Sequence, residues 1–380
     1  MTRSLLLKNA ALMAPADGFE GQVRDVLIAD GLIAEIGPDL KTPARADVLD
    51  LTGLTAAPGF IDIHTHVDPD GPLNIGLFPD MAGIFSGNST IIDAGSTGAG
   101  NFEAFRDKYI QNSRTRVYAL LNLARNGIDS WSELAEEGNL APEALKAVAR
   151  ANPGLAVGVK VRSDAEAVGG MGLTPFRMGR QVARELGLPL VVHIGEAPPT
   201  MAETLDLAGP GDLLTHCYTA YAPNGIYNSL VGEDGRVLDA VWRAKERGAL
   251  FDVGHGGSSF SFKIARAAFE QGFYPDFIGT DIYTWNFFQP VGSLARTMTK
   301  IMHLGLSPAE CVRRVTSAPA DFFSLKGLGH LRVGDLGDLT IFRLVEAEAD
   351  LVDSKGVMER ASRQLTVESV VVGGRVHQLA

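Results

Sequence analysis

Residues 59–66 decide the fold, and they read Gly59-Phe60-Ile61-Asp62-Ile63-His64-Thr65-His66. Side chains alternate between two faces along a strand, so Asp62, His64 and His66 share one face while the isoleucines take the other. In a parallel barrel, the polar face would look into the interior and its carboxyl-end mouth. Two histidines so spaced are half of a metal site, but two exposed histidines on a strand edge give the same string. The rest of the chain must therefore supply further ligands.

Seven further strand-like runs follow, and helix-like segments separate many of them. The eight runs are residues 60–66, 89–95, 115–123, 156–162, 190–196, 212–217, 250–255 and 277–283, and the clearest helical segments are 142–151, 176–186, 238–247 and 262–272. Strands that alternate with helices form parallel βα units. Eight such units predict a (β/α)8 TIM barrel over residues 57–330, with its chemistry at the carboxyl ends of the strands.

The sequence pattern at both ends of the chain differs from that of the central region. Residues 1–56 alternate short apolar runs with turn signals such as Asp30-Gly31, and similar runs return at 337–342 and 367–376. Hairpin strands explain this pattern best. We therefore expect residues 1–56 and 331–380 to build one small β-sandwich domain beside the barrel.

Composition narrows the class of protein. The chain has 380 residues, 46% of them hydrophobic, and a net charge of −11, which argues against a nucleic-acid partner held through phosphates. No apolar run is long enough to span a membrane, and residues 5–7 are too short for the core of a signal peptide. Two cysteines, Cys217 and Cys311, cannot form a disulfide framework. We expect a cytoplasmic enzyme without nucleic-acid or membrane partners.

The strand at residues 156–162 carries an unusual lysine. Its valines take one face, which leaves Gly158, Lys160 and Arg162 on the face toward the barrel interior. Burial lowers the pKa of an ammonium, and a neutral amine can capture CO2 as a carbamate, an anion able to bridge two metals. The alternative is a lysine whose ammonium reaches solvent or pairs with an acid.

Companion residues at other strand ends favour the metal interpretation. His193 and His216 each lie near the end of an apolar run, and Asp281 lies in the last run. Each alone has an ordinary explanation, a hydrogen-bonded core histidine or a capping aspartate. Together with the first histidine pair and Lys160 they form a jointly specific set. Imidazole and carboxylate ligands suit zinc, and also iron, nickel, cobalt or manganese.

With these residues in view, the chain resembles the amidohydrolase superfamily over essentially its whole length. The family signature Pro-Gly-Phe-Ile-Asp-x-His-x-His matches Pro58 to His66, and residues 329–341 look like the return strand into the small domain, with Gly337 where alanine is usual. Within the superfamily, residues 215–220, 251–262 and 279–283 are similar to an amidohydrolase/deacetylase subgroup of the dihydroorotase-like branch.

The resemblance implies a site with two divalent metal ions, in the first place zinc. It assigns His64, His66 and Asp281 to one metal, His193 and His216 to the other, and a CO2-derived carbamate on Lys160 to the bridge. It also implies that Asp281 is catalytic, taking a proton from the attacking water and returning it to the leaving group.

Four further residues are candidates for substrate binding. Arg162 is placed to grip a carboxylate, although a structural ion pair explains it equally well. His255 lies before a Gly-Gly-Ser-Ser loop and either binds substrate or caps the turn. Tyr218 and Tyr283 follow ligand strands and either donate to an oxyanion or pack in the core.

These features predict a metal-dependent hydrolase that removes an acyl group, in the first place acetyl, from a small α-hydroxy or α-amino carboxylate by ester or amide hydrolysis. Opening of a cyclic amide, as in dihydroorotase or hydantoinase, is the alternative reaction. A catalytically silent scaffold homologue is the alternative of another class, and the complete ligand set argues against it. Homo-oligomerisation is compatible with the sequence.

Overall fold

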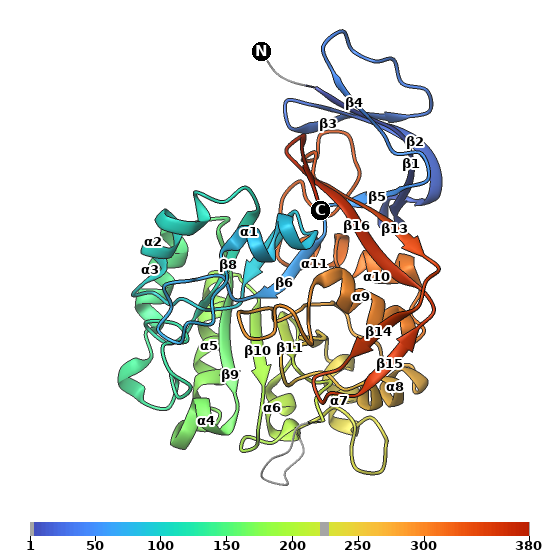
Figure 1. The fold of residues 1–380 in the computed structure, drawn as a ribbon. Helices are drawn as coiled ribbons and strands as arrows, with labels where there is room; N and C mark the ends of the chain where they lie inside the picture. The colour runs from blue at the N-terminus through green and yellow to red at the C-terminus, as the bar shows by residue number, and fades with distance from the viewer. Residues whose placement is uncertain (1–3, 221–227, 380) are drawn as a thin grey trace.

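The computed structural model describes residues 4–220 and 228–379. A curled parallel sheet surrounded by helices forms the larger part, and a second sheet, built from the two ends of the chain, lies beside it (Figure 1). Blue and red strands mix in that second sheet, so segments far apart in sequence are neighbours there. The predicted division into a barrel and a terminal β domain is therefore present.

Seven of the eight predicted runs form one parallel sheet. Its strand order is β12-β11-β10-β9-β8-β7-β6, so each strand pairs with its neighbour in sequence. The strands are β6 (Ile61–Thr65), β7 (Thr90–Asp93), β8 (Arg116–Asn122), β9 (Ala156–Ser163), β10 (Leu190–Ile194), β11 (Asp212–Thr215) and β12 (Leu250–Phe251). This sequential parallel order confirms the barrel class of fold.

The eighth run, residues 277–283, differs from the expectation because it is not a regular strand. It makes single parallel bridges, Asp252 to Phe277 on one side and Thr65 to Ile282 on the other. The main chain of Asp281 is left-handed, with φ of 50°, and this conformation interrupts any ladder. The segment nevertheless lies between β12 and β6 and closes the barrel.

Helices cover the sheet and confirm the predicted alternation. They are α1 (Pro79–Ala82), α2 (Phe102–Phe105), α3 (Pro142–Ala151), α4 (Ala165–Val168), α5 (Thr174–Leu186), α6 (Met201–Leu207), α7 (Asp239–Glu246), α8 (Phe262–Glu270), α9 (Leu294–His303), α10 (Pro308–Arg313) and α11 (Ser317–Phe322). Within the described parts of the chain, none of the helices has the length and apolar character needed to cross a membrane.

Apolar side chains fill the floor of the barrel. Val191 and Leu213 belong to one buried cluster with Leu120 and Phe277, which come from other segments of the barrel. Val191 lies two residues before His193 and therefore on the same face of β10. Apolar side chains thus fill the interior at the amino ends of the strands, and polar groups gather at the carboxyl ends.

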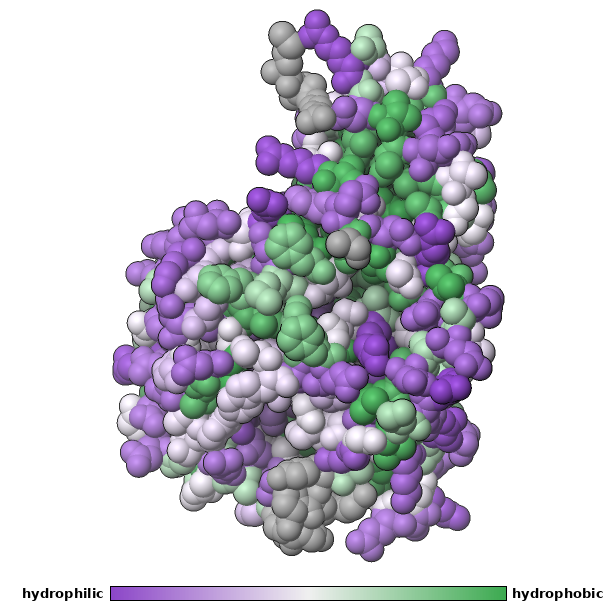
Figure 2. Space-filling view, in the orientation of Figure 1, coloured by the Kyte–Doolittle hydropathy of each residue, from purple (hydrophilic) through white to green (hydrophobic). Residues whose placement is uncertain are grey.

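The eight strands of the terminal domain are hydrogen-bonded into one connected sheet. Its order is β17-β16-β13-β5-β1-β2-β3, with β4 paired to β1. The strands are β1 (Leu5–Ala14), β2 (Phe19–Ala29), β3 (Leu32–Gly37), β4 (Asp47–Asp50), β5 (Thr55–Pro58), β13 (Leu339–Val345), β16 (Gln364–Val372) and β17 (Arg375–Gln378). The sheet has its own apolar core, and hydrophobic side chains also gather on its visible face (Figure 2).

A hairpin inside the carboxyl-terminal arm lies with the barrel instead. Strands β14 (Ala349–Val352) and β15 (Met358–Ala361) form a sheet of their own. Leu351 and Ala361 belong to the main cluster of the barrel core, and the hairpin lies beside α8 (Figure 1). The segment 331–380 is therefore shared between the two parts of the molecule.

Candidate metal centre and active site

Three of the predicted metal ligands form a compact cluster at the carboxyl end of β6. Nε2 of His64 and Nε2 of His66 lie 3.4 and 3.2 Å from Oδ1 of Asp281. One ligand atom from each residue lies within 4.8 Å of the others, and all three residues are buried. The cluster fits a metal site, because two imidazoles and a carboxylate converge on one point.

The other three predicted ligands continue this cluster. Nζ of Lys160 lies 3.3 Å from Nε2 of His64. The ring of His216 lies 4.8 Å from that of His64 and 4.2 Å from that of His193, measured between centroids. Residues from β6, β9 and β10, from the segment after β11 and from residues 277–283 therefore lie close together at one end of the barrel.

Two glycines make room for these side chains. A Cβ atom on Gly95 would lie 2.8 Å from Cβ of Lys160, and one on Gly279 would lie 2.9 Å from Cβ of His64. Real Cβ atoms do not approach so closely, so the lysine and the histidine fit only because neighbouring segments lack side chains at these points.

Outer hydrogen bonds orient His66 and His216. Nδ1 of His66 lies 2.9 Å from Oγ of Ser96, which itself donates to Asp93 at 2.7 Å. Nδ1 of His216 lies 2.7 Å from the carbonyl oxygen of Gly254. Both rings thus have their outer nitrogen engaged, and Nε2 is left for the cluster. Metal-binding histidines have this arrangement, because the second hydrogen bond fixes the ring and its tautomer.

The outer nitrogen of His64 is also engaged, through Thr215 to the carboxylate of Asp252. Its Nδ1 lies 3.2 Å from Oγ1 of Thr215, which donates to Asp252 at 2.9 Å. The backbone N–H of Gly279 also donates to Asp252, at 2.6 Å. His193 is turned the other way, with Nε2 lying 3.8 Å from Asp164, so Nδ1 is its nitrogen left for the cluster. The donor set as a whole fits divalent cations.

Burial favours the neutral forms of four predicted ligands. It lowers the pKa values of His64 and His193 well below the usual range, and that of His216 to about 4. Burial also lowers the pKa of Lys160 to about 8. Neutral imidazoles bind metals, and a lysine with a lowered pKa is a better nucleophile.

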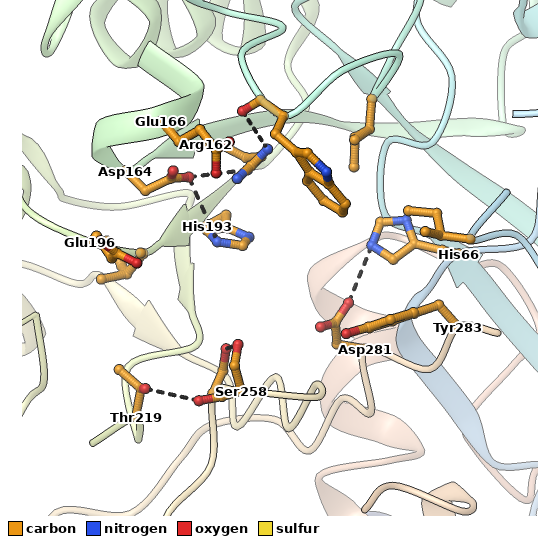
Figure 3. A pocket seen from close by; sticks show the side chains of 16 residues that line it. His66, Arg162, Asp164, Glu166, His193, Glu196, Thr219, Ser258, Asp281 and Tyr283 are labelled. Carbon is orange, nitrogen blue, oxygen red and sulfur yellow. Dashed lines mark hydrogen bonds and ion pairs between the residues drawn. The ribbon is translucent and has the colours of Figure 1, made fainter. Parts of the chain in front are cut away.

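A cavity of about 540 Å³ opens above the cluster. Arg162, Asp164, Glu166, His193 and Glu196 form one wall, and His66, Asp281 and Tyr283 lie opposite (Figure 3). Thr219, Ser258 and Ser259 line a third side, and Ile75, Ile128 and Trp131 add apolar surface. The volume suits a small molecule.

Arg162 lines this cavity but already has acidic partners. Its Nη1 lies 3.1 Å from Oε2 of Glu133, and its Nε lies 3.1 Å from Oδ2 of Asp164. The guanidinium also lies 5.8 Å from the ring centre of Trp131. The ion-pair alternative is therefore realised here, while the side chain keeps its place in the cavity wall. Burial raises the pKa of Glu133 to about 7, although Arg162 opposes this.

Of the two predicted tyrosines, only Tyr283 reaches the cavity. Burial, with the charge of Asp281 as a smaller cause, raises the pKa of its hydroxyl to about 12. Tyr218 is fully buried, and its ring lies 6.2 Å from that of Phe269 in α8. The predicted contact of Tyr218 with substrate is therefore wrong, because its ring packs in the core outside the cavity.

The predicted substrate contact of His255 is also wrong, because this residue is buried behind residues 256–259 and does not line the cavity. Its ring stacks on Phe260 at 4.7 Å. Its Nδ1 lies 2.9 Å from the carbonyl oxygen of Gly256, and its Nε2 lies 2.8 Å from Nζ of Lys300 in α9. With no exposed surface and both ring nitrogens engaged, His255 supports the loop rather than lining the cavity.

The sequence reasoning missed several carboxylates of the site. Asp93 and Asp252 support His66 and His64 from outside, and Asp164 and Glu133 flank Arg162. The first two lie inside predicted apolar runs, where a buried carboxylate needs a partner; that was the available signal. Glu133 lies in the long segment after β8, where nothing in the sequence marks it.

Comparison with known proteins places this architecture. The Amidohydrolase family matches the chain over residues 55–377. A deacetylase of Brucella anthropi is 35% identical over 98% of this chain and 92% of its own length. A crystal structure described as an adenine deaminase has a TM-score of 0.92 and 34% identity, and covers 98% of this chain and 99% of its own. One described as a dihydroorotase has a TM-score of 0.90 and 34% identity, and covers 99% of each chain.

Proposed function

This chain belongs to the amidohydrolase family and is a metal-dependent hydrolase, and from that premise we propose that it removes an acyl group, in the first place acetyl, from a small α-hydroxy or α-amino carboxylate. The relatives named deacetylases support the type of reaction, since they align with nearly the whole chain. The proposed cofactors are two divalent metal ions, zinc in the first place, with a carbamate on Lys160 between them.

One observation carries this proposal: the six predicted ligands lie in one cluster, of which His66, His193 and Asp281 line the cavity beside Arg162. His64, His66 and Asp281 hold one ion in the proposal, and His193 and His216 hold the other. Lys160 lies against His64, so a carbamate on its Nζ would supply an anionic ligand beside the cluster. When bound, the ions supply Lewis acidity and a water of lowered pKa near a substrate carbonyl.

The chain's own residues then handle protons and orientation. Oδ1 of Asp281 faces both His64 and His66, so in the proposed reaction this carboxylate takes a proton from water and returns it to the leaving group. Tyr283 lies on the same side of the cavity, with a hydroxyl of raised pKa that stays protonated and donates to a developing oxyanion.

Arg162 is the proposed receptor of the substrate carboxylate. Glu133 and Asp164 already hold its guanidinium in the cavity wall. Binding of a substrate carboxylate therefore requires little further loss of side-chain freedom. Trp131 and the neighbouring isoleucines offer apolar surface to the remainder of the substrate. A small acid with an apolar side chain matches these surfaces.

Cyclic amide opening remains the second candidate reaction. The observation in its favour is the dihydroorotase structure, which is as similar in sequence as the one described as an adenine deaminase. Deacetylation, cyclic amide opening and adenine deamination each add water to a carbon that is bonded to a leaving heteroatom. The metal cluster alone therefore does not choose among these three reactions.

A substrate panel tests the proposal. N-Acetylalanine, O-acetyllactate and their methyl esters are compared with dihydroorotate, a hydantoin and adenine, all with the metal-loaded protein. We expect release of acetate from the free acids to be fastest. Ring opening or ammonia release without acetate release would replace the proposed reaction by one of the alternatives.

Elemental analysis tests the proposed cofactors independently of substrate. Two divalent ions per chain are expected after purification with bicarbonate and metal. A value at or below one, even after reconstitution, would contradict the binuclear site, and a value near zero would favour the silent scaffold.

A further inference from the structure

The segment after β12, residues 252–261, contacts both the cluster and the cavity. The carbonyl oxygen of Gly254 accepts from His216, and a Cβ atom on Gly256 would lie 2.4 Å from Oδ2 of Asp281. Ser258 and Ser259 line the cavity. We call residues 256–259 the cavity loop. Its main chain packs directly against the proposed catalytic carboxylate.

The β14–β15 hairpin holds this loop from outside. Oγ of Ser354, in the hairpin turn, lies 2.9 Å from the carbonyl oxygen of Gly256 and 3.2 Å from that of His255. The backbone N–H of Ser354 donates to the carbonyl oxygen of Phe260 at 3.0 Å, and the N–H of Phe260 donates to Oγ of Ser354 at 3.3 Å. One serine therefore joins both ends of the loop.

A second side chain of the turn reaches the middle of the loop. Nζ of Lys355 donates to the carbonyl oxygen of Ser258 at 2.9 Å. Asp353 fixes the turn itself, because its carboxylate accepts from the backbone N–H groups of Lys355 and Val357 at 2.8 and 2.9 Å. It also accepts from the N–H of Phe262, where α8 begins.

The hairpin has firm attachments of its own to the barrel. Glu359 in β15 forms an ion pair with Arg266 of α8 at 2.6 Å, and its carboxylate lies 2.8 Å from Nε2 of His303 in α9. Nη2 of Arg296 donates to the carbonyl oxygen of Asp350 at 2.7 Å. The two strands on either side of the turn are therefore attached to α8 and α9. Through its hydrogen bonds to the loop, the turn can restrict the movement of the loop as well.

We propose that the turn of the β14–β15 hairpin, residues 353–357, is a positioning element for the cavity loop, with Ser354 setting the loop against Asp281 and Lys355 setting the cavity wall at Ser258. Neither side chain reaches the cavity in this role; both act through main-chain carbonyl groups. The kinetic consequence rests on the proposed hydrolase function, whereas the structural consequence does not.

The two contacts predict different kinetic effects. Loss of the Ser354 hydroxyl frees the loop beside the carboxylate that moves protons, so kcat falls by about 10-fold while KM changes by less than about 2-fold, since misplacement of a catalytic group acts on the chemical step. Loss of the Lys355 ammonium frees the wall at Ser258, so KM rises by about 5-fold with little change in kcat.

The test uses metal-loaded full-length protein with the variants Ser354→Ala and Lys355→Met. Hydrogen exchange measured on peptides covering residues 252–262 reports on the loop without any substrate, and kinetics with O-acetyllactate and N-acetylalanine report on its consequence. Ser354→Thr and Lys355→Arg keep the donor groups and should restore wild-type values. Arg360→Met is the matched control, since Arg360 pairs with Asp350 and Glu348 on the hairpin and not with the loop.

Faster exchange in the loop peptides of the two variants, with the control unchanged, supports the proposal. Unchanged exchange in both variants overturns it, whatever the activity. Equal acceleration in Arg360→Met also overturns it, because the effect would then be general loosening of the hairpin. If no probe is hydrolysed by the wild type, the proposed function fails while the exchange result still decides the positioning role.

Discussion

Two fully buried lysines on opposite sides of the barrel show how differently its two halves are built. Lys160 lies on β9, in the half with regular strands, and its Nζ faces His64. Lys300 lies on α9, behind the irregular half formed by β12 and residues 277–283, and its Nζ lies between His255 and the carbonyl oxygen of Pro290. Burial lowers the pKa of the first to about 8 and of the second to about 7.

The difference lies in the partners rather than in the burial. Lys300 donates to two acceptors and completes a closed hydrogen-bond network that supports a loop. Lys160 has a ring nitrogen of a proposed metal ligand as its neighbour, beside a carboxylate and further imidazoles. A lowered lysine pKa is thus not by itself a sign of function; the surrounding donors decide what the amine does.

Removal of the Lys160 side chain should have the largest effect. Lys160→Ala should lose bound metal and at least about 10⁴-fold in kcat/KM, because the bridging anion is gone and the activated water with it. Short carboxylic acids that fill the vacated space should restore part of the activity. Metal analysis and steady-state kinetics are the measurements.

Two variants serve as controls for Lys160→Ala. Lys160→Arg should not recover activity, because a guanidinium keeps its positive charge and cannot become an anionic bridge. Lys300→Met should keep both metals, since Lys300 contacts His255 and not the cluster. Wild-type turnover and metal content in Lys160→Ala would mean that this lysine, too, is only structural.

The irregular half is tested by a methyl group at Gly256. This residue has φ of +54°, and a Cβ atom would lie 2.4 Å from Oδ2 of Asp281. Gly256→Ala should therefore displace the carboxylate and lower kcat by about 100-fold, with about 1 kcal/mol lost in stability. Gly272→Ala is the control, because Gly272 has φ of +80° with nothing within 4 Å. Equal kcat in the two variants would show that Asp281 tolerates the shift.

The same contrast explains how far the sequence predicted the site. In the regular half, a period of two and the apolar runs sufficed to place Lys160, Arg162 and His193 on one face at the strand ends. The six predicted metal ligands lie close together for the same reason, and their binding of metal stays a prediction.

In the irregular half, the pattern of the sequence did not predict the structure as well. Residues 277–283 were expected to form a strand, but the left-handed conformation of Asp281 leaves only single bridges. Tyr218 and His255 follow strands that end early, so their side chains do not keep the inward alternation. The hairpin turn that supports the cavity loop is about a hundred residues away in sequence, and no periodicity predicts such a contact.

Arg162 tests whether the regular half also recognises substrate. A charge-assisted pair with a carboxylate contributes about 1.5–3 kcal/mol, so Arg162→Met should lose roughly ten- to a hundred-fold in kcat/KM on O-acetyllactate and little on its methyl ester. Arg180→Met is the control, since Arg180 lies near Asp212 and does not line the cavity. Equal losses on acid and ester would make Arg162 a structural residue held by Glu133 and Asp164.

Lys300 gives the smallest expected effect, and it is measured as stability against pH. Because burial lowers its folded-state pKa to about 7 from 10.5, the unfolded chain binds a proton that the folded chain lacks between these two values. Stability should therefore rise with pH across this window, by at most about 1.4 kcal/mol per pH unit. Lys300→Met retains most of the apolar stem and removes the titrating amine, so its curve should be flatter.

The measurement is urea unfolding of both proteins between pH 7 and 8.5 at equal metal content. The difference between the two curves isolates Lys300, because other titrating groups are common to both. Lys263→Met, which removes a charge from the exposed side of α8, is the matched control and should run parallel to the wild type. Parallel curves for Lys300→Met and the wild type would mean that the buried ammonium stays charged when folded. Lys300 would then be a cation held by His255 and Pro290, and the comparison with Lys160 would rest on geometry alone.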